Sequence, residues 1–165
     1  MSLSDRRAVL LGLGASAFVL TGCLRPMLAA DGPASGLLGR IAFPDVEDRF
    51  DYFLDQSLAA RLGRTSSPAY RLEISTKVTE RGLAIAQDNS VTRITLIVDA
   101  GWTLRRMADN AAVIADDLRL QSGYSATSSL FATRQTKRDV ERRLARDLGE
   151  RIARVLLARA DEATG

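Results

Sequence analysis

Residues 94–104 read ITLIVDAGWTL. Apolar side chains recur at every second position, which is the period of a β-strand with one buried face. The same period of two appears in residues 70–78, which read YRLEISTKV, and again within residues 113–124. Polar turn signals at residues 87–90 and 107–110 separate the three segments. The pattern therefore predicts three sequential strands in an antiparallel meander.

The alternation also predicts which side chains of these strands face the core. The expected core positions are Tyr70, Leu72, Ile74, Thr76, Val78, Ile94, Leu96, Val98, Ala100, Trp102, Leu104, Leu118, Leu120 and Tyr124. The expected polar face includes Arg71, Glu73, Ser75, Lys77, Arg93, Thr95, Asp99, Thr103 and Arg105. We interpret Tyr70 and Trp102, together with Phe53 upstream, as core residues rather than as stacking platforms for a ligand.

The end of the chain predicts a long amphipathic helix. An apolar stripe recurs at four-residue spacing and consists of Val140, Leu144, Leu148, Ile152 and Leu156. This spacing places the stripe on one face of a helix. On the other face, arginines alternate with Asp and Glu, which is typical of a solvated helix surface rather than of a nucleic-acid-binding one.

A short strand and a first helix are expected before the meander. Residues 40–43 predict a strand that Pro44 ends, and Asp48 or Asp51 could cap a helix over Phe53, Leu54, Leu58 and Leu62. Gly63 then ends this helix. Two amphipathic helices, and strands with one apolar face each, can bury their apolar faces together if both helices pack on one face of a four-stranded sheet. We therefore predict a two-layer α+β sandwich in the order strand, helix, three strands, helix.

The N-terminal segment has the layout of a secretory signal. Arg6 and Arg7 precede an apolar run of 13 residues, Ala8 to Leu20, which is shorter than the roughly 20 residues that a membrane-spanning helix needs. Either general secretion or twin-arginine export fits this start. The sequence Leu20-Thr21-Gly22-Cys23 resembles the lipobox of bacterial lipoproteins, which implies a lipid on Cys23. We expect a signal peptide at residues 1–22, a lipidated tether at 23–39 and one folded domain at 40–165.

The composition excludes several classes of catalytic mechanism. The chain contains no His, so it lacks the usual general base, the commonest metal ligand, and any serine–histidine or cysteine–histidine nucleophile system. Asp116 and Asp117 are adjacent in an expected strand, where neighbouring side chains point to opposite faces. We read this pair as solvated rather than as a catalytic dyad. We expect a protein that is not an enzyme and that holds no metal or cofactor, apart from the covalent lipid on Cys23.

The charge balance gives no reason to expect a nucleic-acid partner. Residues 23–165 contain 21 Lys and Arg against 19 Asp and Glu, a formal net charge of +2. A nucleic-acid-binding domain usually carries a much larger excess, gathered on one face.

The lipobox and the element order together resemble the lipopolysaccharide-assembly lipoprotein family LptE. Members typically start with a Cys-Gly-Phe-x-Pro-Leu-like segment, and here Cys23, Pro26 and the apolar Met27 fit while Leu24 and Arg25 depart. The short segments Gly123-Tyr124-Ser125 and Ser129-Leu130-Phe131-Ala132 look like the family's stretch between the last strand and the last helix.

This resemblance implies an outer-membrane lipoprotein that plugs a large β-barrel, LptD, and assists its assembly for lipopolysaccharide transport. By resemblance to the Gram-negative sorting rule, Leu24 after Cys23 favours the outer membrane, because Asp would favour retention in the inner one. The implied partners are an LptD-like barrel, lipopolysaccharide and the membrane that holds the anchor. Two other hypotheses stay open: an auxiliary lipoprotein of a lipid-trafficking ABC transporter, and a His-free periplasmic hydrolase with convergent carboxylates.

Lipopolysaccharide carries phosphates, so its candidate contacts are basic residues without an evident acidic partner. The guanidinium group of Arg suits phosphate because it donates two parallel hydrogen bonds. Three candidates lead into the final helix, and three lie at the ends of the third strand: Arg134, Lys137 and Arg138, and Arg93, Arg105 and Arg106. A ligand phosphate near the first group would also be favoured by the dipole at a helix N-terminus.

Overall fold

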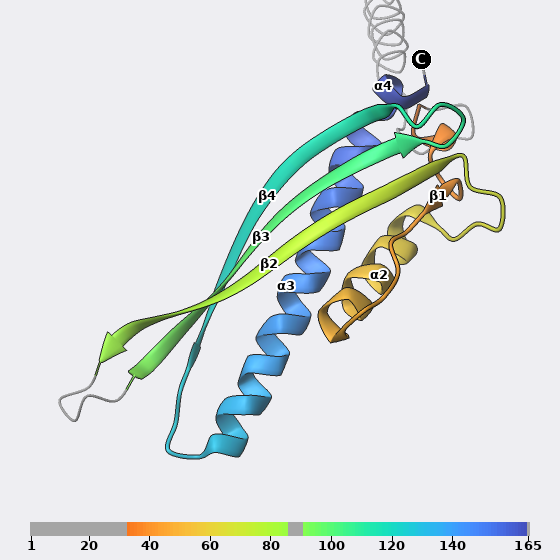
Figure 1. Ribbon diagram of the computed structural model, residues 1–165. Helices are drawn as coiled ribbons and strands as arrows, with labels where there is room; N and C mark the ends of the chain where they lie inside the picture. The colour runs from red at the N-terminus through yellow and green to blue at the C-terminus, as the bar shows by residue number, and fades with distance from the viewer. Residues whose placement is uncertain (1–32, 86–90, 165) are drawn as a thin grey trace, which may run out of the picture.

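The computed structural model describes residues 33–85 and 91–164. In Figure 1 the long strands form one twisted, curved sheet, and the long helices lie on the same side of it. The elements are η2 (Pro33–Gly36), β1 (Ile41–Ala42), α2 (Arg49–Leu62), β2 (Tyr70–Ile85), β3 (Val91–Arg106), β4 (Ala112–Ser125), α3 (Leu130–Ala158) and α4 (Ala160–Thr164). The predicted α+β class and the order strand, helix, three strands, helix are confirmed. The short η2 and α4 are additions to the predicted order.

The four strands pair in chain order, β1-β2-β3-β4. The meander of β2, β3 and β4 is antiparallel as predicted, whereas β1 pairs parallel to the start of β2, so the sheet is mixed. In this register Trp102 lies between Ile74 of β2 and Asp116 of β4. The register therefore places the alternate apolar residues of neighbouring strands on one common face.

The core forms on that face of the sheet. Every predicted core position of β3 from Leu96 to Leu104 is buried, including Trp102 at 3% exposure, and Leu72, Leu120 and Tyr124 are buried too. The prediction was wrong for Val78, which is 43% exposed. It was also wrong for Thr95, which was predicted on the polar face of the sheet but is only 9% exposed. Thr95 belongs to β3, which is paired on both sides, and its partners in the register are Arg81 of β2 and Gly123 of β4.

The two helices begin where the local sequence caps them. Asp48, and not Asp51, is the N-cap of α2: its carboxylate accepts a hydrogen bond from the Asp51 backbone N–H at 2.9 Å. Gly63 ends α2 with a φ of 77°, a conformation that glycine adopts at little cost. Ser129 caps α3 by accepting from the N–H of Ala132. The helix α3 thus begins earlier than its apolar stripe indicated.

The helices α2 and α3 lie against each other and run in the same direction, since Phe53 is near Arg142 while Arg61 is near Glu150. They approach each other closely at Gly149. A Cβ atom on Gly149 would lie 2.7 Å from the Cβ of Ser57, closer than real atoms pack. Ser57 also donates its hydroxyl to the backbone oxygen of Arg146 at 2.9 Å. The absence of a side chain at position 149 therefore allows the two helices to form one layer.

The packed domain includes residues that the sequence assigned to the tether. Ala34 and Leu37 are fully buried, and η2 contacts the C-terminal α4. The Tyr70 hydroxyl donates to the Ala163 backbone oxygen at 3.0 Å, which joins β2 to the same C-terminal segment. The predicted signal peptide, Cys23 and the turn at residues 87–90 lie outside the described residues. Within the described ranges, no helix combines the length and apolar character needed to cross a membrane.

The apolar stripe of α3 leads to a first prediction. Leu148 is fully buried, so Leu148→Asp would place an unpaired carboxylate in the core at a cost of several kcal/mol, comparable to the total stability of an ordinary domain. We expect loss of the cooperative urea-unfolding transition. The matched control is Leu130→Asp in the same helix, where the side chain is 73% exposed and the transition should stay within about 0.5 kcal/mol of the wild type. Equal behaviour of the two variants would contradict the assigned buried face.

Candidate functional site

The six predicted phosphate contacts fall into two groups at opposite ends of the sheet. Arg105 and Arg106 end β3 opposite the start of β2, whereas Arg93 pairs with Ser125 at the other end. The twelve residue steps from Arg93 to Arg105 correspond to about 40 Å of strand. The first half of α3 lies at the Arg93 end, because Lys137 contacts Glu80 late in β2. The structure therefore brings Arg93, Arg134, Lys137 and Arg138 to one end, which we call the distal end, and leaves Arg105 and Arg106 at the other.

Lys137 joins α3 to the sheet. Its ammonium group forms ion pairs with Glu80 of β2 and with Glu141 one turn along α3, the latter at 3.8 Å. The hydrogen bond with Glu80 raises the pKa of Lys137, and burial opposes that shift. Tyr124 of β4 lies in the same electrostatic cluster, and its pKa is raised first by burial and then by the Glu80 carboxylate, with Lys137 opposing. The expectation that Lys137 lacks an acidic partner was wrong.

Arg105 and Arg106 also have carboxylate partners. Arg105 donates to Glu73 on the neighbouring strand at 2.9 Å and to the Asn110 backbone oxygen at 3.2 Å. Arg106 pairs with Asp109 at 3.3 Å. These contacts hold the turn between β3 and β4 to the sheet. Both arginines therefore have a structural role that their positions in the sequence did not indicate.

The remaining candidates are free cations. Arg93, Arg134 and Arg138 are exposed, and none of them forms an ion pair within the part of the chain that the structure describes. The Arg93 side chain lies across Gly123 of β4, where a Cβ atom would be 3.8 Å from its Nε. Arg134 and Arg138 stand one and two turns inside α3, because the helix begins at Leu130. The expected help from the helix dipole at a first turn therefore does not apply to them.

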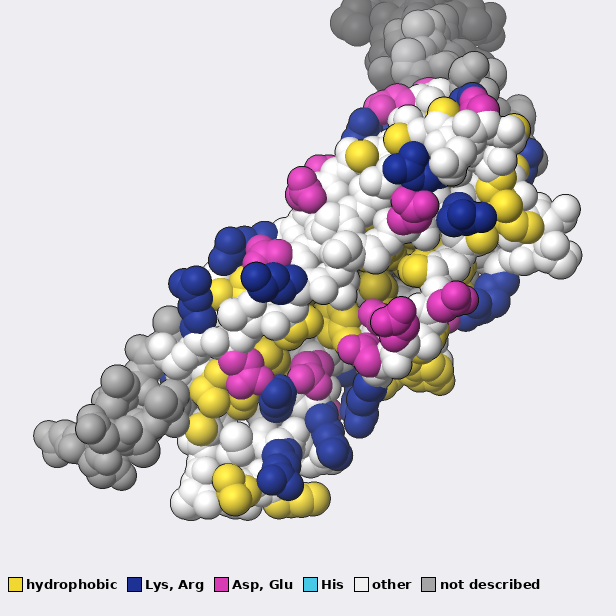
Figure 2. Space-filling model, viewed as in Figure 1, with side chains coloured by type: hydrophobic (Ala, Val, Ile, Leu, Met, Phe, Trp, Pro, Cys, Tyr) yellow, Lys and Arg dark blue, Asp and Glu magenta, His cyan; other side chains and the backbone are white. Residues whose placement is uncertain are grey.

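Two exposed apolar side chains begin the same helix. Leu130 is 73% exposed and Phe131 is 77% exposed. Figure 2 shows apolar side chains and a group of basic side chains near the lower end of the molecule, where α3 begins in Figure 1. The distal end thus combines unpaired cations with apolar surface, which suits an anionic amphiphile or a membrane-like surface.

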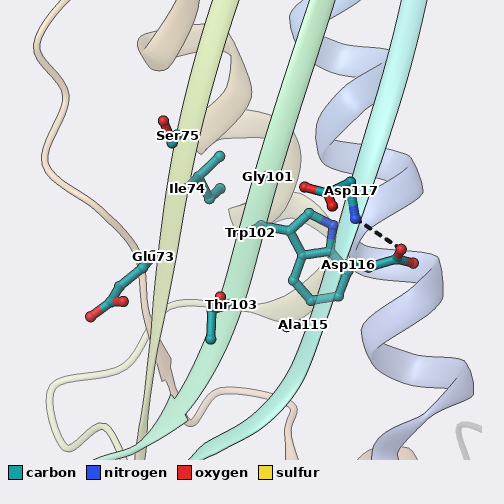
Figure 3. Close-up of a pocket in the computed structure, with 9 residues that line it drawn as sticks. All are labelled: Glu73, Ile74, Ser75, Gly101, Trp102, Thr103, Ala115, Asp116 and Asp117. Atoms are coloured by element: carbon teal, nitrogen blue, oxygen red, sulfur yellow. Dashed lines mark hydrogen bonds between the residues drawn. The ribbon is translucent and has the colours of Figure 1, made fainter.

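Figure 3 shows a shallow depression around Gly101, lined from three strands by residues that include Asp116 and Asp117. Asp116 is the partner of Trp102 in the strand register and Asp117 is the partner of Gly101, so the two residues belong to opposite faces of the sheet. The only hydrogen bond drawn there runs from the Asp117 backbone N–H to the Asp116 carboxylate, at 2.8 Å. Both residues are exposed, so the prediction of a solvated pair on opposite phases is confirmed. Among the described residues, no group of three or more His, Cys, Asp or Glu is placed to hold a metal ion.

Comparison with solved structures relates this architecture to known proteins. No model of a protein family matches the sequence, and no curated protein matches it. A Caulobacter crescentus CB15 protein assigned to the lipoproteins is similar, with a TM-score of 0.63, 22% identity, and coverage of 78% of this chain and 96% of that one. Rare lipoprotein B from Shewanella oneidensis has a TM-score of 0.61 at 9% identity, over 76% of this chain and 98% of that one.

A minor lipoprotein from Acinetobacter baumannii adds a third match, with a TM-score of 0.53 and 17% identity, over 72% of this chain and 89% of its own. The fold is one that bacterial lipoproteins adopt. At these identities the likeness concerns architecture, and each neighbour is covered over nearly its whole length. The described domain therefore shares its architecture with these three chains over most of their length.

The Lys137 contact leads to a prediction on pH. Because the folded pKa lies above the ordinary 10.5, the contact stabilises the protein fully below that pH and is lost as the pH rises through the raised value. Lys137 is 39% exposed, so solvent screening limits the effect, and Lys137→Met should lower stability by about 0.5–1 kcal/mol near neutral pH. The difference from wild type in urea unfolding should shrink above pH 10.5.

The matched control for this experiment is Arg138→Met, the neighbouring residue that has no ion pair in the described structure. Its stability difference should be smaller and should not change over the same pH range. A Lys137→Met effect that is independent of pH would contradict the role of the Glu80 contact.

Proposed function

We propose that this protein is an LptE-type outer-membrane lipoprotein, anchored by lipid on Cys23, that occupies an LptD-like β-barrel and assists its assembly in lipopolysaccharide transport. The observation that carries the proposal is the fold, which matches lipoproteins over 96% and 98% of their own lengths. The lipobox Leu20-Thr21-Gly22-Cys23 supports the same proposal by a different kind of evidence, because it is a sequence motif and not a feature of the fold.

The anchor and the distal end would lie far apart. The first described residue, Pro33, is in η2, which contacts α4 at the C-terminal end of α3. From there α3 extends over 29 residues, or about 43 Å at 1.5 Å per residue. A lipid on Cys23 would hold the end with α4 close to the inner leaflet of the outer membrane. The distal end, with its free cations, would then be directed away from the anchor.

The surface of the sheet suits the interior of a barrel. Residues on the face opposite the helices are mainly polar or small, and they include Glu73, Ser75, Gly101, Thr103, Asp117 and Arg119. The lumen of a large outer-membrane barrel is polar and hydrated, so a domain with such a face can occupy it without burying unpaired charge. The helix layer on the other face supplies the rigidity that a plug requires.

The distal end provides the contacts proposed for lipopolysaccharide. Arg134, Arg138 and Arg93 are available to phosphate groups, and Leu130 and Phe131 offer adjacent apolar surface for acyl chains. Lys137 contributes positive charge but is already paired with Glu80. The role proposed here is binding and guidance, and it includes no catalytic step.

The anchor and the barrel partner can be tested in one experiment. We predict that the wild-type chain incorporates labelled palmitate and co-purifies with a large outer-membrane β-barrel from detergent-solubilised membranes. Cys23→Ala should abolish the label and release a folded protein, because Cys23 is not among the residues 33–85 and 91–164 that form the described core. A palmitate label that persists in Cys23→Ala would contradict the proposal that Cys23 carries the lipid. Co-purification with transporter subunits in place of a barrel would favour an auxiliary lipoprotein of a lipid transporter.

The distal end can be tested with lipopolysaccharide itself. We expect the triple change of Arg134, Lys137 and Arg138 to Ser to weaken binding by about tenfold or more and to flatten its salt dependence, since it removes three cations from one end. The matched control is Arg105→Ser with Arg106→Ser, at the opposite end of the sheet. Binding should be measured across a salt series, with circular dichroism to verify the fold. Unchanged affinity of the triple variant would remove these residues from the proposed site.

A further inference from the structure

Three arginines converge on the ring of Phe53 at the junction of α2 and α3. The guanidinium carbons of Arg49, Arg142 and Arg146 lie 5.6, 5.3 and 5.7 Å from the centre of that ring. Any two of these cations are therefore within about 11 Å of each other, comparable to the distance over which salt screens charge. Arg49 comes from α2 and the other two come from α3, so the helix packing at Gly149 assembles the cluster.

The positive charge of this cluster is mostly uncompensated. Arg142 pairs with Asp139 at 3.3 Å, while Arg49 and Arg146 form no ion pair with any residue that the structure describes. Farther along the same helix junction, Arg61 pairs with Glu150 at 3.5 Å. Among the described residues, the arginine at the neighbouring position of the junction is thus paired, whereas only one of the three arginines at Phe53 is.

Arg142 adds a second, independent observation. Its Nε is a buried donor without a hydrogen-bond partner. Such donors are rare in folded proteins because leaving one unpaired costs free energy. An acceptor supplied from outside the described chain would satisfy it. The donor lies within a cluster that already attracts negative charge.

We propose that Arg49, Arg142 and Arg146 form a binding site for a phosphate group, with Phe53 as its apolar floor. A guanidinium that lies over an aromatic ring keeps the N–H groups at the edge of its plane free to donate. Three such groups from two helices match the several oxygens of a phosphate, which can accept from more than one of them at once. This site is separate from the lipopolysaccharide contacts proposed above, since it uses none of those residues.

Two sources could supply this chemistry: inorganic phosphate in solution, or the headgroup of a phosphorylated lipid. The simpler alternative is that the arginines only cover Phe53 with their apolar stems and gain cation–π attraction. That alternative predicts that the protein does not bind phosphate at this cluster. The proposal predicts saturable binding of phosphate there.

The test is isothermal titration calorimetry of the full chain in non-ionic detergent, with inorganic phosphate in one arm and short-chain phosphatidic acid in the other. Sodium chloride at matched ionic strength is the baseline. We expect binding in at least one arm, and at least about tenfold weaker binding in Arg49→Gln and Arg146→Gln. Arg146→Lys should fall between them and the wild type, because Lys keeps the charge but loses the planar fork.

The matched control is Arg143→Gln, an exposed arginine of the same helix outside the cluster, which should bind as the wild type does. Binding in the phosphate arm alone would assign the site to a soluble phosphate, and binding only in the lipid arm would assign it to a headgroup. Absence of binding in both arms, or equal affinity in Arg146→Gln, Arg49→Gln and the wild type, would overturn the proposal. Thermal melts of each variant would verify that the helix layer is intact.

Discussion

The close packing of α2 and α3 at Gly149 determines how the helix layer is built. Any side chain at this position would collide with Ser57 and approach the backbone oxygen of Leu54. Because the helices can approach there, they form one layer that covers one face of the sheet and buries Leu54, Leu58, Leu148 and Ile152 together. The same contact sets the register between the helices. Phe53, one turn before Ser57, therefore lies under Arg142 and Arg146, and the proposed phosphate site follows from the way the core is packed.

The sequence predicted the elements whose side chains repeat with a clear period. The alternation in β3 and the four-residue stripe of α3 both identified buried positions correctly, because a long element with one buried face must repeat that pattern. Short or irregular segments were different. The parallel pairing of β1 rests on only two residues, and η2 is held by contacts with α4, more than a hundred residues away. The start of α3 was missed because Leu130 and Phe131 are apolar yet exposed, and so do not continue the stripe.

The candidate site was less predictable than the fold because ion pairs form across the sheet. Glu141 is close to Lys137 in sequence, but Glu80 is 57 positions earlier and reaches Lys137 only because α3 lies against the sheet. Glu73 meets Arg105 through the strand register in the same way. Phe53 was read as a core residue, and its ring is instead half-buried beneath three arginines contributed by two helices. Helical spacing alone cannot show which charges a second helix brings to a ring.

The distribution of charge along α3 connects these observations. From Leu130 to Arg146 the helix carries six basic and two acidic residues, whereas from Asp147 to Ala158 it carries two of each. The first half is thus strongly positive and the second half is neutral. Salt screens exposed charges beyond about 8–10 Å, so this field acts on whatever approaches the distal end and the Phe53 junction. It has little effect at the end with α4, where Arg159 is paired with Glu162. A helix that needed charge only for solubility would have no reason to separate its charges in this way. The uncompensated charge of the first half of α3 therefore lies at the same end of the molecule as the contacts proposed for an anionic ligand.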